Sequence, residues 1–191
     1  MNIVVINGGA RATSRTRGLA LAFAHALTSR KVTVSYFDVG VDLLPIYTGS
    51  NDQQEIAAVK KLISFAEQAD GFFICTPEYH SGMSGALKNA LDFLGGKQFN
   101  GKPVVIGAAA GGGKGGMNAL GNLRTVLRGV YALALPDQIV VDPDHFDEQL
   151  RLANQDVVDR LEMMADELVR VTGLIRGKGQ KAIKIAFKFF M

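Results

Sequence analysis

Five short apolar runs are spaced along the chain and separated by longer segments of mixed polarity. They lie at 3–6 (IVVI), 32–37, 72–75, 104–106 and 138–141 (QIVV), and most of their residues are β-branched or aromatic. Runs that are apolar on both faces are typical of strands covered on both sides. The pattern therefore predicts a parallel sheet of five buried strands.

The segments between these runs carry apolar residues three or four positions apart, which is the spacing of an amphipathic helix. The stripes are Leu19, Phe23, Leu27; Ile56, Val59, Ile63, Ala66; Leu87, Leu91, Leu94; Met117, Leu120, Leu123, Leu127, Val130; and Leu150, Ala153, Val157, Leu161, Met164, Leu168. Strands and helices alternate throughout, which predicts one doubly wound α/β domain. Five strands fit the order 2-1-3-4-5, with helices on both faces.

The composition narrows the class of protein. A chain of 191 residues can bury its own core, and its single cysteine excludes a disulfide framework and a cysteine-rich zinc site. Cys75 lies in an apolar run, so we predict a buried core thiol rather than a reactive one. The N-terminal segment lacks the basic region of a signal peptide, and no apolar run approaches the roughly 20 residues that span a bilayer. We expect a cytoplasmic protein without a membrane span.

The net charge of +3 comes from the C-terminal end of the chain. Five of the 21 basic residues lie in 176–191, and no acidic residue follows Glu167. Residues 1–175 therefore hold 16 basic and 18 acidic side chains. A nucleic-acid interface would require basic residues clustered on a folded face, and the sequence shows none, so we expect no nucleic-acid partner.

Ligands of open α/β sheets bind outside the carboxyl ends of the strands, so the loops after the first, third and fourth strands are candidates. The first loop, 7–17 (NGGARATSRTR), combines small residues, three hydroxyls and three arginines directly before a helix. Backbone N–H groups, hydroxyls and a helix N-terminus are groups that bind phosphate. The loop matches neither GxGxxG nor GxxxxGK[ST]. The alternative is an ordinary turn with Ser14 or Thr16 as the N-cap.

The second loop, 76–89 (TPEYHSGMSGALKN), forms a platform of one proline, one aromatic residue and two glycines at a strand end. Ser84 does not lie in a GxSxG motif, so hydrolase chemistry has little support. His80 by itself is typical of a polar loop residue. The three histidines form no HExxH motif, and we predict no metal site.

The third loop, 110–116 (AGGGKGG), has five glycines in its last six positions. Glycine lets the backbone approach a flat ligand closely, although a flexible surface loop is the alternative. Lys114 lacks the following Ser or Thr of a nucleotide-binding loop. It is a candidate to pair with an acid such as Asp142 of its own or a neighbouring subunit.

Together these segments resemble the NADPH-dependent FMN reductase family of the flavodoxin-like superfamily. PEYHSGMSGALKNALDFL at 77–94 is similar to the family's PEYN-x-S-x-P-G-x-LKNAIDW segment, GGARATS at 8–14 to its GSxRxxS loop, and 111–127 to its glycine loop and following helix. Within the family the likeness is to bacterial FMN-dependent NADPH azoreductases (azobenzene reductases), over roughly residues 1–170. Gly9, His80 and Ser84 depart from the family's Ser, Asn and Pro.

The resemblance implies a bound FMN and its contacts. Arg11, Ser14 and Thr16 would hold the phosphate, the segment after the third strand would follow the flavin ring and ribityl chain, and the glycine loop would border the other ring edge. The implied cofactor-binding residues are Gly9, Arg11, Ser14, Arg15, Thr16, Pro77, Glu78, Tyr79, His80, Gly111, Gly112, Gly113 and Lys114. Tyr79 would also orient the acceptor, and no side chain is expected to act as a general acid.

The resemblance also implies a flavodoxin-like three-layer sandwich and a homodimeric or homotetrameric oxidoreductase. It would take hydride from NADPH, or from NADH, and reduce azo compounds and quinones by a ping-pong mechanism. Alternatives are a general quinone, chromate or flavin reductase, a flavodoxin-type electron carrier, and a non-catalytic FMN-binding module. Electron carriers of that type are strongly acidic, whereas residues 1–175 are nearly neutral.

Two further segments carry expectations. The loop 39–51 is long for a strand-to-helix connection, and we expect it to cover the flavin or to reach a partner subunit. The tail 176–191 lies outside the domain of residues 1–175 and has no counterpart in the resemblance. Its alternation of Ile183, Ile185, Phe187 and Phe189 with lysines predicts a strand, or a peptide that binds a membrane surface or a partner. We expect residues 178–191 to be dispensable.

Overall fold

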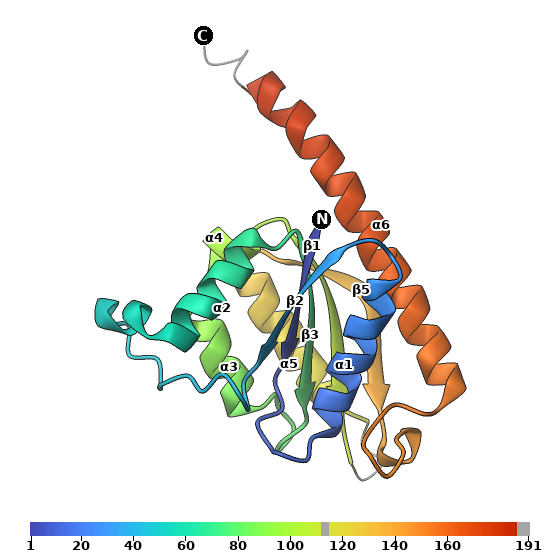
Figure 1. Ribbon diagram of the computed structural model, residues 1–191. Helices are drawn as coiled ribbons and strands as arrows, with labels where there is room; N and C mark the ends of the chain where they lie inside the picture. The colour runs from blue at the N-terminus through green and yellow to red at the C-terminus, as the bar shows by residue number, and fades with distance from the viewer. Residues whose placement is uncertain (112–114, 187–191) are drawn as a thin grey trace.

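The computed structural model describes residues 1–111 and 115–186, with side chains to residue 177. Five parallel strands form one sheet in the order β2-β1-β3-β4-β5, as the sequence predicts. Figure 1 shows the sheet between two helical layers. The strands are β1 (Asn2–Asn7), β2 (Thr33–Asp38), β3 (Gly71–Pro77), β4 (Pro103–Ala109) and β5 (Leu133–Val141).

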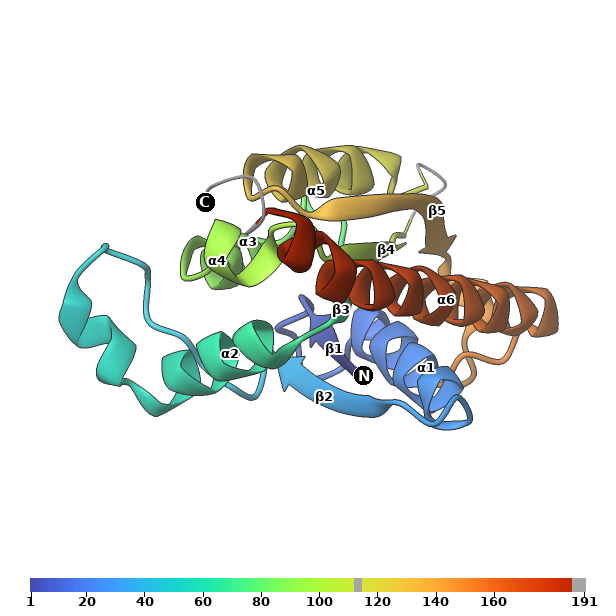
Figure 2. The ribbon, with the colours of Figure 1, turned by 90° about the horizontal axis from the view of Figure 1, so that it is seen from above.

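Helices cover both faces of the sheet, which Figure 2 shows from above. On one face are α1 (Arg15–Thr28) and α6 (Gln155–Ala186). On the other are α2 (Ala57–Gln68), α3 (Gly85–Asp92), α4 (Gly96–Phe99) and α5 (Met117–Gly129). Two 3₁₀ turns, η1 (Asn51–Glu55) and η2 (Pro143–His145), lie in the connections. The layers are those of a flavodoxin-like three-layer sandwich.

Alternate strand residues fill two separate cores because successive side chains point to opposite faces. Val4 and Ile6 pack toward α2, α3 and α5, whereas Ile3 and Val5 pack toward α1 and α6. The central strands β3 and β4 are buried along their whole length. Cys75, in β3, is fully buried, and burial raises the pKa of its thiol. The prediction of a buried core cysteine is confirmed.

The apolar stripe expected from Leu150 to Leu168 begins later than predicted. Leu150 has a left-handed backbone (φ +60°), and α6 begins at Gln155. The Asn154 side chain accepts a hydrogen bond from Val157 N at 3.2 Å, so Asn154 is the N-cap at which α6 starts. Leu150 and Ala153 are therefore outside the helix. Met117 is also on the expected helix but is 56% exposed, so it does not belong to the core.

The strand expected in the tail is wrong over the described residues, because α6 continues to Ala186. No proline interrupts 155–186, so the helical hydrogen-bond ladder continues across residue 175. Figure 1 shows the C-terminal part of α6 extending beyond the sheet, away from the carboxyl ends of the strands. Phe187 and Phe189 lie outside the described residues. None of the helices in the described part of the chain is long and apolar enough to cross a membrane.

Candidate functional site

A cavity of about 260 Å³ lies at the carboxyl edge of the sheet, where the loops after β1, β3 and β4 meet. This is the edge at which open α/β sheets bind ligands. Its lining residues are Arg11, Thr13, Ser14, Arg15, Thr16, Pro77, Glu78, Tyr79, Ala109, Ala110 and Gly111. The structure thus brings together three loops that are far apart in the sequence.

The first loop delivers polar groups to the N-terminus of α1. Ser14 is the N-cap, and its Oγ accepts a hydrogen bond from Arg17 N at 3.2 Å. The first turn of a helix presents backbone N–H groups without intrahelical partners, and the helix dipole adds positive potential there. Arg11 and Arg15 are exposed beside it, and neither has an ion-pair partner among the described residues. These cations are available to an anionic ligand.

Short-range contacts hold the start of this loop in one conformation. The buried Asn7 side chain bonds both the N–H and the carbonyl of Gly9, at 3.0 and 3.1 Å. Gly8 N donates to Cys75 O at 2.8 Å, and Ser84 Oγ donates to Gly8 O at 2.6 Å. A Cβ on Gly9 would lie 2.3 Å from Ser14 Oγ, so only glycine permits this approach. The loop is therefore anchored to β3 and to the N-cap of α3.

Arg17 holds the same loop through hydrogen bonds to its carbonyl groups, a role that the sequence did not predict. Its guanidinium pairs with Asp38 at 2.7 and 3.2 Å and donates to the carbonyls of Ala12 (2.7 Å) and Arg11 (3.3 Å). The Asp38 side chain is 6% exposed. Asp38 ends a strand whose last residues are buried, and a buried charge requires a partner of opposite charge. This requirement was the one sign in the sequence that Asp38 would pair with a basic residue.

The environment of Asp38 makes the stability of the fold depend on pH. Burial by itself raises the pKa of Asp38, but the bonds from Arg17, Gly40 N and Asn7 outweigh it and hold that pKa below its usual value. A depressed pKa stabilises the fold at pH values above the unfolded-state pKa of about 3.9, and this stabilisation is lost as the pH falls through the folded-state value.

We therefore expect the free energy of unfolding to fall as the pH decreases from about 5 to about 2, with part of the fall due to Asp38. Urea denaturation of the wild type and of Asp38→Asn across this range measures that part. The asparagine variant is expected to show a shallower decrease. An equal decrease in the two proteins would show that Asp38 does not contribute.

The second loop links β3 to α5 through Glu78. Glu78 N donates to Ala109 O at 3.2 Å, and Glu78 Oε2 accepts from Ala119 N, in the first turn of α5, at 3.1 Å. The N-cap residue of α5 is Gly116, which has no side chain to perform this function. Glu78 therefore supplies the missing cap and fixes the start of α5 relative to the cavity.

The next residues form a tight turn with a demanding backbone. Tyr79 and Gly82 exchange two backbone hydrogen bonds, at 2.9 and 3.0 Å, around His80 and Ser81. Both central residues have positive φ, +50° and +63°. A two-residue turn of this kind favours Asn, Asp or Gly, because other residues are strained in the left-handed region. The turn presents Tyr79, which is 39% exposed, to the cavity, while His80 is not among the lining residues.

The strain at His80 predicts a stabilising substitution. His80→Asn is expected to raise the free energy of unfolding by about 0.5 kcal/mol, because Asn tolerates the left-handed conformation better than His. Urea denaturation measures the change. His25→Asn, within α1, is the control and is expected to give no gain, since Asn has no advantage in a helix interior. A loss of stability in His80→Asn would contradict this account of the turn.

Most of the residues implied for the site line the cavity: Arg11, Ser14, Arg15, Thr16, Pro77, Glu78, Tyr79 and Gly111. Gly9 lies beneath Ser14 and His80 in the turn, and neither lines it. Gly112, Gly113 and Lys114 fall outside the described residues. The cavity is also lined by Thr13, Ala109 and Ala110, which were not among the residues implied for the site. Their position at the edge of the sheet is the only signal for them in the sequence. Among the described residues, no cluster of His, Cys, Asp or Glu is suited to a metal.

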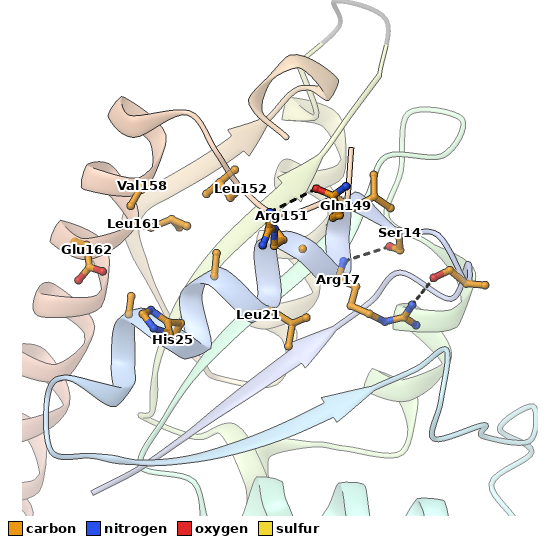
Figure 3. A pocket seen from close by; sticks show the side chains of 15 residues that line it. Ser14, Arg17, Leu21, His25, Gln149, Arg151, Leu152, Val158, Leu161 and Glu162 are labelled. Atoms are coloured by element: carbon orange, nitrogen blue, oxygen red, sulfur yellow. Dashed lines mark hydrogen bonds between the residues drawn. The ribbon is translucent and has the colours of Figure 1, made fainter. Parts of the chain in front are cut away.

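A larger cavity of about 500 Å³ runs along α1, between that helix, residues 149–152 and the first turns of α6. We call it the α1 groove; Figure 3 shows its lining side chains. Its walls are mainly leucine, valine and alanine, whereas hydroxyls and the exposed Arg11 and Arg15 surround the smaller cavity. The groove is the larger of these two cavities, but the converging polar groups at the sheet edge favour the smaller cavity as the main site.

The family model of NADPH-dependent FMN reductases matches residues 1–146. The chain belongs to this family. It is 47% identical to an NADPH azoreductase of Bacillus sp. (strain OY1-2) over 145 residues. This alignment covers 76% of this chain and 79% of the relative. It is 30% identical to an FMN-dependent NADPH-azoreductase of Staphylococcus aureus (strain COL) over 178 residues. That alignment covers 88% of this chain and 94% of the relative.

Solved structures show the same fold at lower sequence identity. The flavoenzyme NAD(P)H:(acceptor) oxidoreductase FerB of Paracoccus denitrificans superposes with a TM-score of 0.73 at 22% identity, over 90% of this chain and 97% of that one. An azoreductase of Bacillus anthracis str. Sterne superposes with a TM-score of 0.64 at 16% identity, over 87% of this chain and 99% of that one. Family membership makes the present protein an oxidoreductase with FMN and NADPH as its cofactors.

The residues of the cavity fit FMN. A flavin phosphate carries close to two negative charges, and the free cations, hydroxyls and helix N-terminus form a donor set for such a group. Pro77 and Tyr79, from the end of β3 and its loop, and Ala110 and Gly111, from the loop after β4, contribute small or flat groups to the lining. The FMN expected from the sequence is thus consistent with the chemistry of this cavity.

Proposed function

We propose that the protein reduces azo compounds and quinones with electrons from NADPH, using FMN bound in the cavity at the carboxyl edge of the sheet. The observation that carries the proposal is the convergence of Arg11, Arg15 and three hydroxyl side chains on the N-terminus of α1. The azoreductase relatives support the choice of azo compounds as acceptors.

The polar end of the cavity binds the phosphate in this proposal. Arg11 and Arg15 neutralise its charge, and Thr13, Ser14 and Thr16 donate hydrogen bonds from their hydroxyls. Arg17 contributes indirectly, because it holds the carbonyls of the loop that carries these groups. The other end of the cavity would receive the flavin ring, between Tyr79 and the start of the glycine loop.

The chemistry requires little of the side chains. FMN, when bound, supplies the two-electron transfer between NADPH and the acceptor. Glu78 is the one carboxylate among the described lining residues, and its Oε2 accepts a hydrogen bond from Ala119 N. The protein's part is therefore to hold the ring, leave one face open to each substrate in turn, and orient the acceptor beside Tyr79. Use of one site by both substrates is the basis of the ping-pong mechanism.

We also propose a homodimer or homotetramer. The segment after β2 carries Val41, Leu43, Ile46 and Tyr47, which are 46–77% exposed. It is nevertheless held in place, since Asn89 on α3 bonds Tyr47 N and Pro45 O, each at 2.8 Å. A fixed, exposed apolar segment is typical of an interface between subunits. Sedimentation velocity measures the oligomeric state.

Steady-state kinetics test the proposed reaction. NADPH oxidation is measured with methyl red as the azo acceptor and with menadione as the quinone, at several concentrations of both substrates. Double-reciprocal plots with parallel lines are expected for both acceptors. Intersecting lines would contradict the ping-pong mechanism. NADPH oxidation only in the presence of free FMN would favour a flavin reductase, and no turnover would favour an electron carrier or a binding module.

A further inference from the structure

The α1 groove is a second cavity, separate from the flavin site except at its end. It follows α1 from Ser14 to Ala26, about 18 Å at the helical rise per residue. Among the residues that the structure describes, Ser14 is the one that lines both cavities. A volume of about 500 Å³ is typical of pockets for small molecules. The groove is therefore long enough for an elongated ligand and large enough to enclose one.

The surface of the groove is mainly apolar. Leu21 and Ala22 contribute from α1, Leu152 from the loop after β5, and Val158 and Leu161 from α6. Figure 3 labels Leu21, Leu152, Val158 and Leu161 among the lining side chains. Leu21 is 51% exposed although it lies in this concave surface. A ligand that fills the groove would remove this apolar surface from water, which is a favourable change.

The groove is preformed by a constrained turn that crosses α1. A Cβ on Gly18 would lie 2.2 Å from Leu150 O, so only glycine allows the turn to approach the helix so closely. The turn is closed by bonds from Asp147 N to Arg151 O and from Leu150 N to Asp147 O, both 2.9 Å. A ligand would therefore not have to pay the entropy of ordering this wall.

The turn at 149–152 contributes one cationic side chain to the groove, Arg151, while Arg17 lines the groove from α1 and is paired with Asp38. Arg151 pairs with Asp147 at 2.8 Å, but its side chain is 76% exposed. The Asp147 carboxylate also accepts hydrogen bonds from Gln149 N (3.0 Å) and Arg151 N (2.8 Å), which lower its pKa. Because the Arg151–Asp147 pair lies at the surface, where ion pairs contribute little to stability, the Arg151 guanidinium can turn to another anion at low cost.

We propose that the α1 groove binds an elongated, mainly apolar small molecule that carries one acidic group, the chemistry of a medium-chain fatty acid. The alkyl chain lies along α1 against Leu21, Leu152 and Leu161. The acidic group lies at the rim beside Arg151. This site is distinct from the flavin cavity and does not depend on the acceptor that the enzyme reduces.

The test is isothermal titration of the FMN-loaded protein with decanoate. Leu21→Gln is expected to weaken binding about tenfold, because it places a polar amide on the apolar wall. Leu174→Gln is the matched control: Leu174 is also a helical leucine with 51% exposure, but it lies outside the groove. Its affinity is expected to equal that of the wild type. Absence of binding to the wild type, or equal losses in the two variants, would overturn the proposal.

A second comparison tests the acidic group. Arg151→Gln is expected to weaken binding of decanoate about fivefold and to leave binding of decanol unchanged. Equal effects on the two ligands would overturn the assignment of Arg151. Turnover of NADPH is measured in the same variants and is expected to stay at the wild-type level in Leu21→Gln. Failure of the flavin chemistry would be visible in that assay independently of decanoate binding.

Discussion

Replacing Arg17 with methionine is expected to lower the free energy of unfolding by about 3 kcal/mol, because it leaves the Asp38 charge buried without its partner. The same change removes the donors to the carbonyls of Arg11 and Ala12, so FMN binding is expected to weaken about tenfold. Urea denaturation of the FMN-free protein measures the first effect. Quenching of FMN fluorescence on binding measures the second.

Two further variants distinguish this account from a general effect of losing an arginine. Arg170→Met breaks an exposed pair with Glu167 and is expected to cost less than about 1 kcal/mol. Adding Asp38→Asn to Arg17→Met removes the uncompensated charge and is expected to restore part of the stability. If the double variant were as unstable as the sum of the single variants, the buried charge would not be the cause.

The second large effect is expected for FMN affinity alone. Replacing both Arg11 and Arg15 with glutamine should raise the dissociation constant for FMN about 100-fold, through the loss of two charge-assisted hydrogen bonds to the phosphate. The free energy of unfolding of the FMN-free protein should stay unchanged, since both side chains are exposed and have no ion-pair partner among the described residues. Titration with FMN at two salt concentrations measures the affinity and its charge dependence.

The control for this pair is Arg128→Gln, an exposed arginine in the last turn of α5. It is expected to bind FMN as tightly as the wild type. A double Arg11 and Arg15 variant that kept an affinity within about twofold of the wild type would mean that the phosphate does not bind at this loop.

Much of the fold could be predicted because the signals were strong and local. Continuous apolar runs marked the strands, but the prediction that all five are buried is wrong at the edges of the sheet: β3 and β4 are buried along their whole length, whereas β2 and β5 are partly exposed. Leu19, Phe23 and Leu27 marked the inner face of α1, and all three are fully buried. The predictions were wrong where the spacing of apolar residues did not match the points at which a helix begins and ends. Leu150 has the spacing of the α6 stripe but lies in a turn, since Asn154 caps the helix. The tail alternates like a strand but continues a helix that no proline stops.

The site was predictable in its parts but less so in the contacts that hold it. Loop composition and strand ends identified the three loops at the carboxyl edge, and the family resemblance supplied the individual residues. The roles of Arg17 and Glu78 depend on partners at Asp38 and Ala119, which are distant in the sequence and appear only in the folded chain. Single-sequence patterns do not contain such pairings. The α1 groove likewise requires α1, the turn at 149–152 and α6 together.

The central claim is that the cavity at the sheet edge holds FMN that NADPH reduces and an azo compound or quinone reoxidises. The most direct measurement is the visible absorption spectrum of the purified protein during anaerobic addition of NADPH and then of methyl red or menadione. We predict flavin bands that bleach with NADPH and recover when the acceptor is added. A protein that shows no flavin spectrum even after incubation with FMN, or whose flavin bands do not change with NADPH, would contradict the account.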